Sequence, residues 1–465
     1  MAKPASLKVV EVCRVAPTPE TTTSDAASET SLPLTFFDLL WVRFPPVERL
    51  FFYEFPHPPS SFFDSLLPKL KNSLSRTLHH FLPLAGNVIW PPHSSKPFIH
   101  YVSGDGVSLT IAESDADFNH LSGSDFSEAE ESRRLVPHLV VSDEKAAVMS
   151  LQITLFPNSG FSVGIATHHA TMDGKSSTLF MKSWAYVCSN LEESSSLSSI
   201  PANLKPSFDR SVMIDPSVIA DRFANFWLKQ GGPDNRSLIS WDLNKTDQGE
   251  LIRGTFELLP SNIQKLKKSA ESKLNKKVHL STFAVTCAHV WNCLVKAEQT
   301  KREKVLFIFS VDCRSRLDPP IPSSYFGNCI GAAKAEAETK NMLGDDGFMF
   351  ALEAIIEALK RLENEAILSV AETWISDMET FGLTETYRTF STAGSPRFEV
   401  YSNDFGWGRP KKVEIVSIDK TGAFALSESR NGDGGIEIGL VLKKSQMEDF
   451  SALFVKGLSA LSSCS

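Results

Sequence analysis

The stretch Phe161–Phe180, FSVGIATHHATMDGKSSTLF, contains the residues around which the fold and the chemistry are organised. Alternating apolar residues predict a strand as far as Thr167, and the apolar spacing after Gly174 predicts a helix. His169 therefore lies just beyond the end of a strand, where an imidazole can face a cleft and act as a general base. The alternative interpretation is a buried histidine beside an Asp173 that caps the following helix.

The same stretch contains a competing nucleophile, Ser162, in the pattern GxSxG formed by residues 160–164. This pattern is typical of serine hydrolases when the serine sits in a sharp turn between a strand and a helix. Here the strand pattern continues beyond the serine through Val163, Ile165 and Thr167. The sequence therefore favours an ordinary strand position for Ser162.

The bulk composition excludes several classes of protein. With 465 residues the chain exceeds the size at which one core stops growing, so two domains are expected. The net charge of -8 argues against nucleic-acid binding. Neither a membrane span nor a secretory signal is apparent, which predicts a cytoplasmic protein without membrane attachment. Seven cysteines without metal-ligand spacing predict reduced thiols and no metal site.

Both halves mix strands and helices without regular alternation, which predicts an α/β or α+β class with two domains of similar size. The Ser/Pro-rich stretch 189–216 is the best candidate for their connection. We divide the chain into an N-terminal domain, 1–205, that carries His169, a crossover linker, 206–240, and a C-terminal domain, 241–465.

Three further stretches stand out. Asp404–Gly408, DFGWG, begins with the DFG triplet of protein kinases, but the other kinase motifs are absent from the sequence, so we interpret it as a glycine turn with a buried tryptophan. Tyr325–Cys329, YFGNC, follows a proline-rich segment. A basic stretch offers a dock for a phosphorylated ligand in an otherwise acidic protein. It contains Lys265, Lys267, Lys268, Lys273, Lys276 and Lys277.

HHATMDG in the first half, combined with DFGWGRP near the C-terminus, resembles the plant BAHD acyltransferase family, and the resemblance covers nearly the whole chain. LPLTFFD, FLPLAGNV, VDCRSR and PPIPSSYFGNC fall in the family's order as well. YFGNC is similar to the branch that acylates anthocyanins and other flavonoid glycosides. The overall pattern looks most like malonyl-CoA-dependent phenolic (flavonoid) glucoside malonyltransferases.

The resemblance implies two chloramphenicol-acetyltransferase-like domains with a channel between them, in which CoA and the acceptor meet at His169. His169 is then the general base, and neither a metal nor a covalent acyl-enzyme takes part. Asp173 is implied to be structural and to pair with Arg314. A structural role is also implied for three residues of DFGWG: Asp404, Gly406 and Trp407.

The ligand-binding residues are less well defined by the resemblance. Hydroxycinnamoyl relatives carry Thr-Ser-Trp before DFGWG, whereas the matching stretch 392–396 reads TAGSP here, so Thr392, Ser395 or a backbone N–H could stabilise the oxyanion. A malonyl donor carries a free carboxylate that needs a cation, for which Lys175 is the candidate. The CoA-binding candidates are Lys265, Lys268, Ser281 and Thr282.

The resemblance thus implies an acyl-CoA-dependent O-acyltransferase. It would move malonyl from malonyl-CoA, a co-substrate and not a bound cofactor, to the primary sugar hydroxyl of a flavonoid, isoflavonoid, anthocyanin or other phenolic glucoside. The expected partners are an acyl-CoA and a phenolic glucoside, and the expected state is a monomer. One alternative keeps the fold and uses a coumaroyl-type CoA donor. A more distant alternative is a BAHD-like ligand-binding protein without catalysis.

Overall fold

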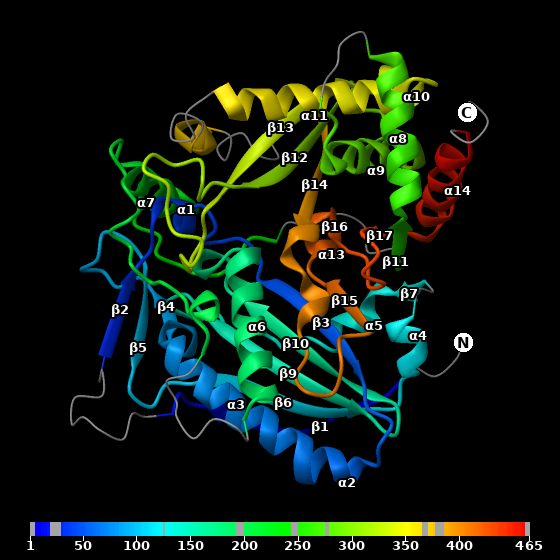
Figure 1. Ribbon diagram of the computed structural model, residues 1–465. Helices are drawn as coiled ribbons and strands as arrows, with labels where there is room; N and C mark the ends of the chain where they lie inside the picture. Colours follow the sequence, from blue (N-terminus) through cyan, green and yellow to red (C-terminus); the bar gives the residue numbers. More distant parts are fainter. Residues whose placement is uncertain are drawn as a thin grey trace.

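The computed structural model describes residues 5–18, 29–123, 126–191, 200–242, 250–274, 279–364, 371–376 and 386–460. Two large mixed sheets, each accompanied by helices, form the lower and upper parts of the molecule in Figure 1. A smaller antiparallel sheet lies beside the lower one. This mixture of helices and strands confirms the predicted fold class.

The lower sheet comes mostly from the first half of the chain. Its neighbouring strands are antiparallel except for β6 and β9, which are parallel. In spatial order the described strands are β1 (Leu7–Val15), β6 (Val107–Ser114), β9 (Met149–Phe156), β10 (Gly160–Thr167), β3 (Val47–Glu54) and β15 (Lys412–Ile415).

The centre of this sheet is buried on both faces. Every residue of β9 and β10 is buried. The helices α6 (Gly174–Ser189) and α3 (Leu67–His80) pack together over one face (Figure 1). Apolar side chains fill the other face: Leu50, Phe52, Phe118, Leu121, Leu135, Phe156 and Val416. The strand that leads to His169 is therefore held in a packed core.

The upper sheet belongs mostly to the second half of the chain. Its described strands in spatial order are β13 (Ile330–Glu338), β12 (Lys304–Asp312), β14 (Tyr387–Gly394), β16 (Ala423–Glu428), β17 (Ile436–Lys443), β11 (Leu251–Leu258) and β7 (Ser127–Glu128). The longer helices beside it are α8 (Pro260–Lys273), α9 (Thr282–Glu298), α11 (Gly347–Asn364) and α14 (Lys444–Ala460). Because α8, α11 and α14 all pack against α9, nearly every residue of α9 is buried.

The two sheets exchange strands. β7 comes from the first half and pairs with β11 in the upper sheet. β15 comes from the second half and pairs with β3 in the lower sheet. The linear division at 205 and 241 therefore omits these exchanges, because strand pairing between residues hundreds of positions apart leaves no local pattern in the sequence.

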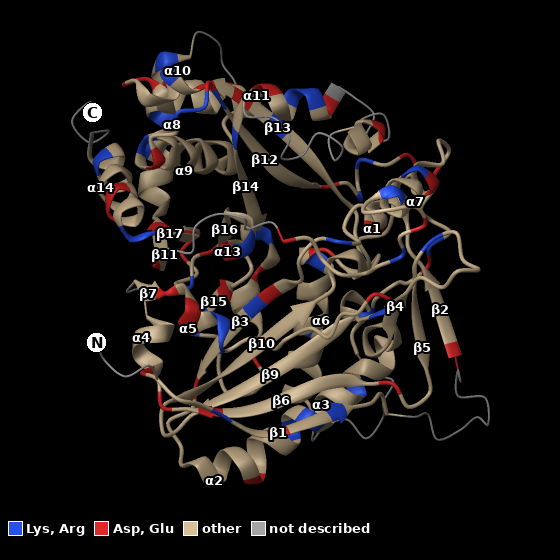
Figure 2. Ribbon diagram, turned by 180° about the vertical axis from the view of Figure 1, so that it is seen from behind, with Lys and Arg blue, Asp and Glu red and all other residues tan. Residues whose placement is uncertain are grey.

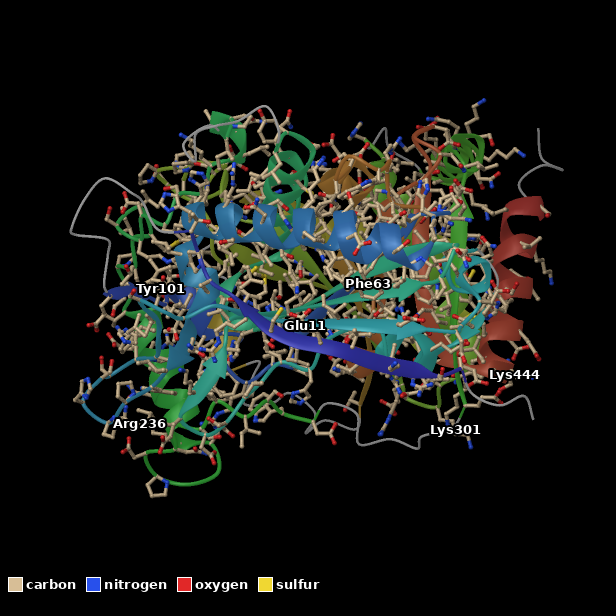
Figure 3. All side chains as sticks on the ribbon, turned by 90° about the horizontal axis from the view of Figure 1, so that it is seen from below. Glu11, Phe63, Tyr101, Arg236, Lys301 and Lys444 are labelled. Carbon is tan, nitrogen blue, oxygen red and sulfur yellow. The ribbon has the colours of Figure 1, made fainter. Side chains whose placement is uncertain are left out.

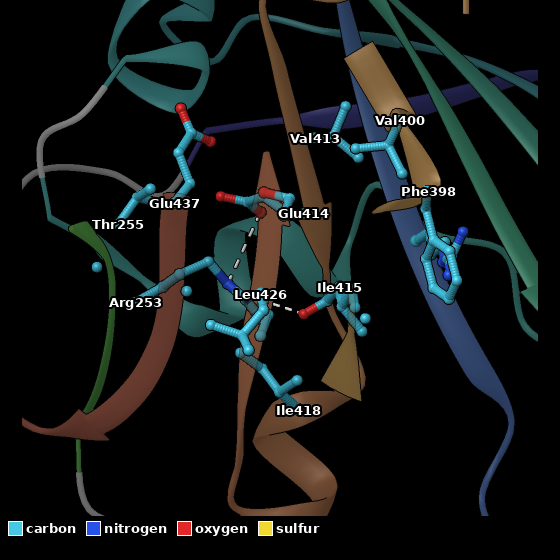
Figure 4. Close-up of a pocket in the computed structure, with 16 residues that line it drawn as sticks. Arg253, Thr255, Phe398, Val400, Val413, Glu414, Ile415, Ile418, Leu426 and Glu437 are labelled. Atoms are coloured by element: carbon cyan, nitrogen blue, oxygen red, sulfur yellow. Dashed lines mark hydrogen bonds and ion pairs between the residues drawn. The ribbon is translucent and has the colours of Figure 1, made fainter. Parts of the chain in front are cut away.

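A buried group of charges lies where the exchanged strand β15 meets the upper sheet (Figure 4). Glu414 forms an ion pair with Lys412 at 2.7 Å and accepts a hydrogen bond from the hydroxyl of Ser132 at 2.8 Å. Arg253 of β11 donates to the backbone oxygens of Ile415 and Val416 at 3.1 and 2.9 Å. Arg253, Glu414 and Ile415 line a cavity of about 40 Å³, which is room for a few water molecules.

The connection between the halves is ordered over the described residues 200–242, while 192–199 of the Ser/Pro-rich stretch lie outside them. It contains α7 (Ile219–Lys229), which packs on α1 (Phe36–Leu39). Arg43 donates to three backbone oxygens of the connection at 2.8 to 3.2 Å, those of Gln230, Asn235 and Ser237.

Short elements complete the described chain. The small sheet contains β2 (Glu29–Pro33), β5 (Phe98–Val102), β4 (Asn87–Ile89) and β8 (Lys145–Ala147). The remaining short α-helices are α2 (Pro59–Ser61), α4 (Phe118–Ser122), α5 (Ala129–Arg133), α10 (Thr339–Leu343) and α13 (Ile418–Thr421).

Basic and acidic residues are interspersed along the ribbon in Figure 2. Figure 3 shows β1 on the underside with Glu11 near its middle, and Lys71 of α3 pairs with Glu11 at 2.8 Å. Among the described residues, no helix combines the length and the apolar character that a membrane crossing requires.

Candidate active site

His169 lies where the sequence predicts, just after β10, at the start of a short 3₁₀ turn, His169–Thr171. Its backbone oxygen accepts from Nδ2 of Asn328 at 2.9 Å. Asn328 is itself held by Asp38, whose Oδ1 accepts from the backbone N and from Nδ2 of Asn328 at 2.8 and 3.0 Å. The backbone at His169 is therefore fixed by a residue of YFGNC, a motif to which the sequence assigned no function.

Asp38 is fully buried and satisfied on both oxygens. Its Oδ2 accepts from the backbone N and from Oγ1 of Thr35, both at 2.9 Å. The sequence interpretation missed Asp38 as a site residue. The pattern Thr-x-x-Asp before an apolar helix could have indicated the local capping contact, but the link to Asn328 spans 290 positions and has no sequence signature.

Asp173 makes both of the contacts considered from the sequence. Its Oδ1 caps α6 by accepting from the backbone N of Ser176 at 2.9 Å. Its Oδ2 lies 2.8 Å from Nη1 of Arg314 and accepts from the backbone N of Cys329 at 3.1 Å. The pair is buried, with side-chain exposures of 3% for Arg314 and 0% for Asp173.

Arg314 has several more partners. Its Nη2 donates to the backbone oxygens of Tyr325 and Gly327, both at 3.2 Å, and to Oγ of Ser176 at 3.3 Å. Burial acts to lower the pKa of Arg314, but the attraction of Asp173 outweighs it, so the pKa is raised. Arg314 therefore stays charged and ties the HHATMDG loop to YFGNC.

The imidazole of His169 is half-buried among aromatic rings. Trp41 stacks on it with ring centroids 4.1 Å apart and an interplanar angle of 5°. Phe44 meets it edge-on at 6.3 Å and 69°. Burial lowers the pKa of His169 to about 4, against the opposing effects of its own backbone and of Asp173. The ring is therefore neutral at cellular pH, as a general base must be.

The two oxyanion candidates lie at the end of β14 and just beyond it. Thr392 is in β14, and the Ser395 hydroxyl accepts from the backbone N of Arg397 at 3.2 Å, which leaves its own proton free to donate. Phe398 lies so close to Gly174 that a Cβ added at Gly174 would be 2.7 Å from the Phe398 ring. The segment after β14 therefore reaches the first turn of α6, five residues from His169.

Lys175 is in contact with a carboxylate of its own protein. Its Nζ lies 3.1 Å from Oδ2 of Asp312, and the two side chains are 38% and 47% exposed. Oδ1 of Asp312 accepts from Arg314 at 3.1 Å. A half-exposed ion pair of this kind is weak and can exchange partners when another carboxylate arrives.

The CoA-binding candidates are not brought together with His169 by any contact in the described residues. Lys265 and Lys268 are exposed on α8, which packs on α9 and α14 at the upper right of Figure 1. Ser281 caps α9 by accepting from the backbone N of Ala284 at 3.1 Å, and Thr282 is the first residue of that helix. Lys276 and Lys277 lie outside the described residues.

DFGWG forms a tight loop against the lower sheet. Oδ1 of Asp404 accepts from the backbone N of Gly406 and of Gly408 at 2.7 and 2.9 Å. Both glycines have φ near +100°, which side chains other than hydrogen disfavour. Trp407 meets Phe161, the first residue of the opening stretch, edge-on at 6.4 Å. These contacts fit the structural role that the resemblance implies.

Ser162 lacks the geometry of a nucleophile. It lies inside β10, opposite Phe52 and Thr154, and its side chain is fully buried. No strand-to-helix turn follows it, because β10 continues to Thr167. The hydrolase interpretation therefore has no support in the structure.

A family model described as the Transferase family matches residues 15–455 of the chain. The chain belongs to the BAHD acyltransferase family. Two relatives, both from Arabidopsis thaliana, illustrate the branch to which this BAHD protein is similar. Phenolic glucoside malonyltransferase 2 is 42% identical, over 97% of this chain and 99% of the relative. Malonyl-CoA:anthocyanidin 5-O-glucoside-6''-O-malonyltransferase is 39% identical, over 98% of this chain and 99% of the relative.

The solved structure of vinorine synthase has a fold similar to that of this chain. The match has a TM-score of 0.70 and 20% identity, and it covers 96% of each chain. The comparisons confirm the predicted family resemblance and the predicted architecture.

Proposed function

We propose that this BAHD acyltransferase transfers malonyl from malonyl-CoA to the primary sugar hydroxyl of a flavonoid or other phenolic glucoside, with His169 as general base. The observation that carries the proposal is a neutral, stacked imidazole on a backbone fixed by Asn328. The names of both curated relatives support the malonyl donor and the glucoside acceptor.

The chemistry follows from what the imidazole can do. A sugar hydroxyl is a poor nucleophile and must lose its proton as it attacks. Nδ1 of His169 is buried, so Nε2 is the nitrogen that takes this proton while the oxygen bonds to the thioester carbon. The tetrahedral intermediate then breaks its C–S bond, and the imidazolium returns the proton to the CoA thiolate. The products are the malonate ester and free CoA, without a covalent acyl-enzyme.

The intermediate carries a negative oxygen that needs a donor. We assign this role to the Thr392 and Ser395 hydroxyls, because the segment that contains them lies against the start of α6. Lys175 is the proposed partner of the malonyl carboxylate. It would exchange its half-exposed pair with Asp312 for a pair with the substrate.

Four other assignments are part of the same proposal. Lys265, Lys268, Ser281 and Thr282 remain the candidates for CoA binding. The two-domain division, with the exchange of β7 and β15 added, remains a prediction, as do the monomeric state and the cytoplasmic location. Size-exclusion chromatography with light scattering tests the monomer.

A panel of acyl-CoAs and phenolic glucosides, scored by product mass, tests the donor. Malonyl-CoA should be consumed much faster than acetyl-CoA or coumaroyl-CoA. Lys175→Met should lower kcat/KM for malonyl-CoA at least tenfold and leave that for acetyl-CoA unchanged. Consumption of coumaroyl-CoA in place of malonyl-CoA would establish the aromatic-donor alternative, and no turnover with any pair would favour the ligand-binding alternative.

A further inference from the structure

The ring of His169 lacks the hydrogen bond that usually orients a catalytic histidine. In a Ser-His-Asp triad, a carboxylate binds Nδ1 and fixes both the plane and the tautomer of the ring. Nδ1 of His169 is buried and makes no hydrogen bond to another residue in the described part of the chain. Asp173 is already engaged by Arg314 and by two backbone N–H groups. Another kind of contact must therefore orient the ring.

Trp41 makes that contact. Its indole and the imidazole are nearly parallel, at 5°, and 4.1 Å apart, which is a close stacked geometry. The ring of Phe44 contacts the imidazole edge-on, with ring centroids 6.3 Å apart. Rotation of the imidazole about its side-chain bonds would break the stack and collide with these rings. The pair of aromatic side chains therefore restricts the ring to one plane.

The same short segment also holds the backbone of His169. The backbone N of Trp41 donates to the backbone oxygen of Asp38 at 3.0 Å. Asp38 in turn holds Asn328, which donates to the His169 backbone oxygen. Segment 35–41 therefore fixes His169 twice, once through Asn328 and once through the indole ring.

We propose that Trp41 is a positioning residue for acyl transfer, and that its indole face stabilises the imidazolium that forms when His169 takes the proton of the acceptor hydroxyl. This inference rests on the proposed function. The face of an indole attracts a cation, and the attraction grows where water is excluded. Because the imidazole is neutral before the reaction and charged during it, the stack is stronger in the transition state than in the ground state.

The titratable groups near the ring do not replace Trp41 in stabilising the imidazolium of His169. His168 is buried, and burial together with its neighbour His169 lowers its pKa to about 4, so it is neutral. Asp38 reaches only the backbone of His169, through Asn328. Asp173 attracts the imidazolium, but its charge is balanced by Arg314 at 2.8 Å.

Replacing Trp41 by leucine and by phenylalanine tests the proposal. Trp41→Leu keeps an apolar neighbour but removes the aromatic face, whereas Trp41→Phe retains a face. We expect Trp41→Leu to lower kcat roughly 10- to 100-fold with KM values within about twofold, because the loss is in orientation. The acid limb of the kcat profile should move down by roughly 0.5 to 1 pH unit, because the imidazolium loses its partner. Trp41→Phe should keep most of the wild-type kcat and an acid limb close to that of the wild type.

The matched control is Trp241→Leu. Trp241 belongs to the same aromatic group, 6.2 Å from Phe44, but is not stacked on His169. This variant should keep the acid limb of the wild type. An unchanged acid limb in Trp41→Leu would overturn the proposal. So would a change confined to KM for the glucoside, which would make Trp41 part of an acceptor platform.

A measurement without turnover separates this inference from the proposed function. The histidine ring signals of the whole protein are followed by NMR between pH 3.5 and 8, with His169→Gln used to assign the signal of His169. The pKa of His169 should be lower in Trp41→Leu than in the wild type or in Trp41→Phe. If the wild type proves inactive but the pKa of His169 is still lower in Trp41→Leu than in the wild type and Trp41→Phe, only the proposed function fails. An equal or higher pKa in Trp41→Leu would contradict the inference itself.

Discussion

Arg314 and Asp173 form a buried ion pair at 2.8 Å that joins the HHATMDG loop of one sheet to the segment after β12 of the other. Asp173 lies four residues from His169, and its carboxylate contacts Arg314 and the backbone N–H groups of Ser176 and Cys329. Asp173 thus positions the loop that carries His169.

Breaking this pair on one side should destabilise the protein strongly. Arg314→Met leaves the Asp173 carboxylate buried without its cation, which costs about 3–5 kcal/mol in buried pairs. Urea unfolding followed by circular dichroism measures the loss. Lys182→Met is the control, because Lys182 pairs with an exposed Glu399 and should cost less than about 1 kcal/mol. A similar loss in both variants would contradict the anchoring role of Arg314.

Asn328→Ala should lower kcat roughly 10- to 100-fold, because the His169 backbone loses its donor and the base shifts from its productive position. Asn292→Ala is the matched control. Nδ2 of Asn292 also donates to a buried backbone oxygen, that of Met342 at 2.7 Å, but within the helices of the upper part. Steady-state kinetics should show a loss of kcat for Asn328→Ala alone, and equal kcat values would show that Asn328 does not position the base.

Stability should fall as the pH drops from 7 to 5. Burial lowers the pKa of His289 to about 4, so in this range the unfolded chain binds a proton at His289 that the folded chain does not. Unfolding is then favoured by acid, by about 2 kcal/mol for this group alone. The free energy of unfolding at the two pH values should differ less in His289→Gln than in the wild type. The exposed His138 serves as control, and His138→Gln should leave the difference unchanged.

Gly174→Ala should disturb the contact between α6 and the segment after β14. The added Cβ would lie 2.7 Å from the Phe398 ring and 3.0 Å from Nη2 of Arg49. Since the oxyanion candidates precede Phe398, we expect kcat to fall at least tenfold. Adding Phe398→Leu should restore part of it by making room. Gly344→Ala, whose nearest contact would be 3.5 Å away, should change kcat less than twofold. A kcat for Gly174→Ala equal to that of the wild type would show that the segment after β14 is not part of the site.

The sequence was sufficient for the local geometry around His169. The alternation in β10 places His169 at a strand end, and the position of Asp173 before Gly174 indicates the helix cap that the structure contains. The ion pair to Arg314 came from the family resemblance and not from the pattern of residues. The order of the family's motifs indicated that Asp173 and Arg314 pair, although they are 141 positions apart in the chain.

The missed features are all contacts between distant segments. Nothing in the sequence near Trp41 or Asp38 indicates that they meet His169 and Asn328, because these contacts join segments 128 and 290 positions apart. The pairing of β15 with β3 could not be predicted from the sequence for the same reason. Composition and periodicity describe how one element faces a core, but not which distant element it meets.

The central claim is that His169 is the base for acyl transfer from CoA. The most direct test is the initial rate of product formation from malonyl-CoA and a phenolic glucoside, measured by mass spectrometry for the wild type and for His169→Ala. Removal of the base should lower the rate at least 100-fold, in line with the usual contribution of general base catalysis, while the thermal midpoint stays close to that of the wild type. A folded His169→Ala that retains a tenth or more of the wild-type rate would contradict the account.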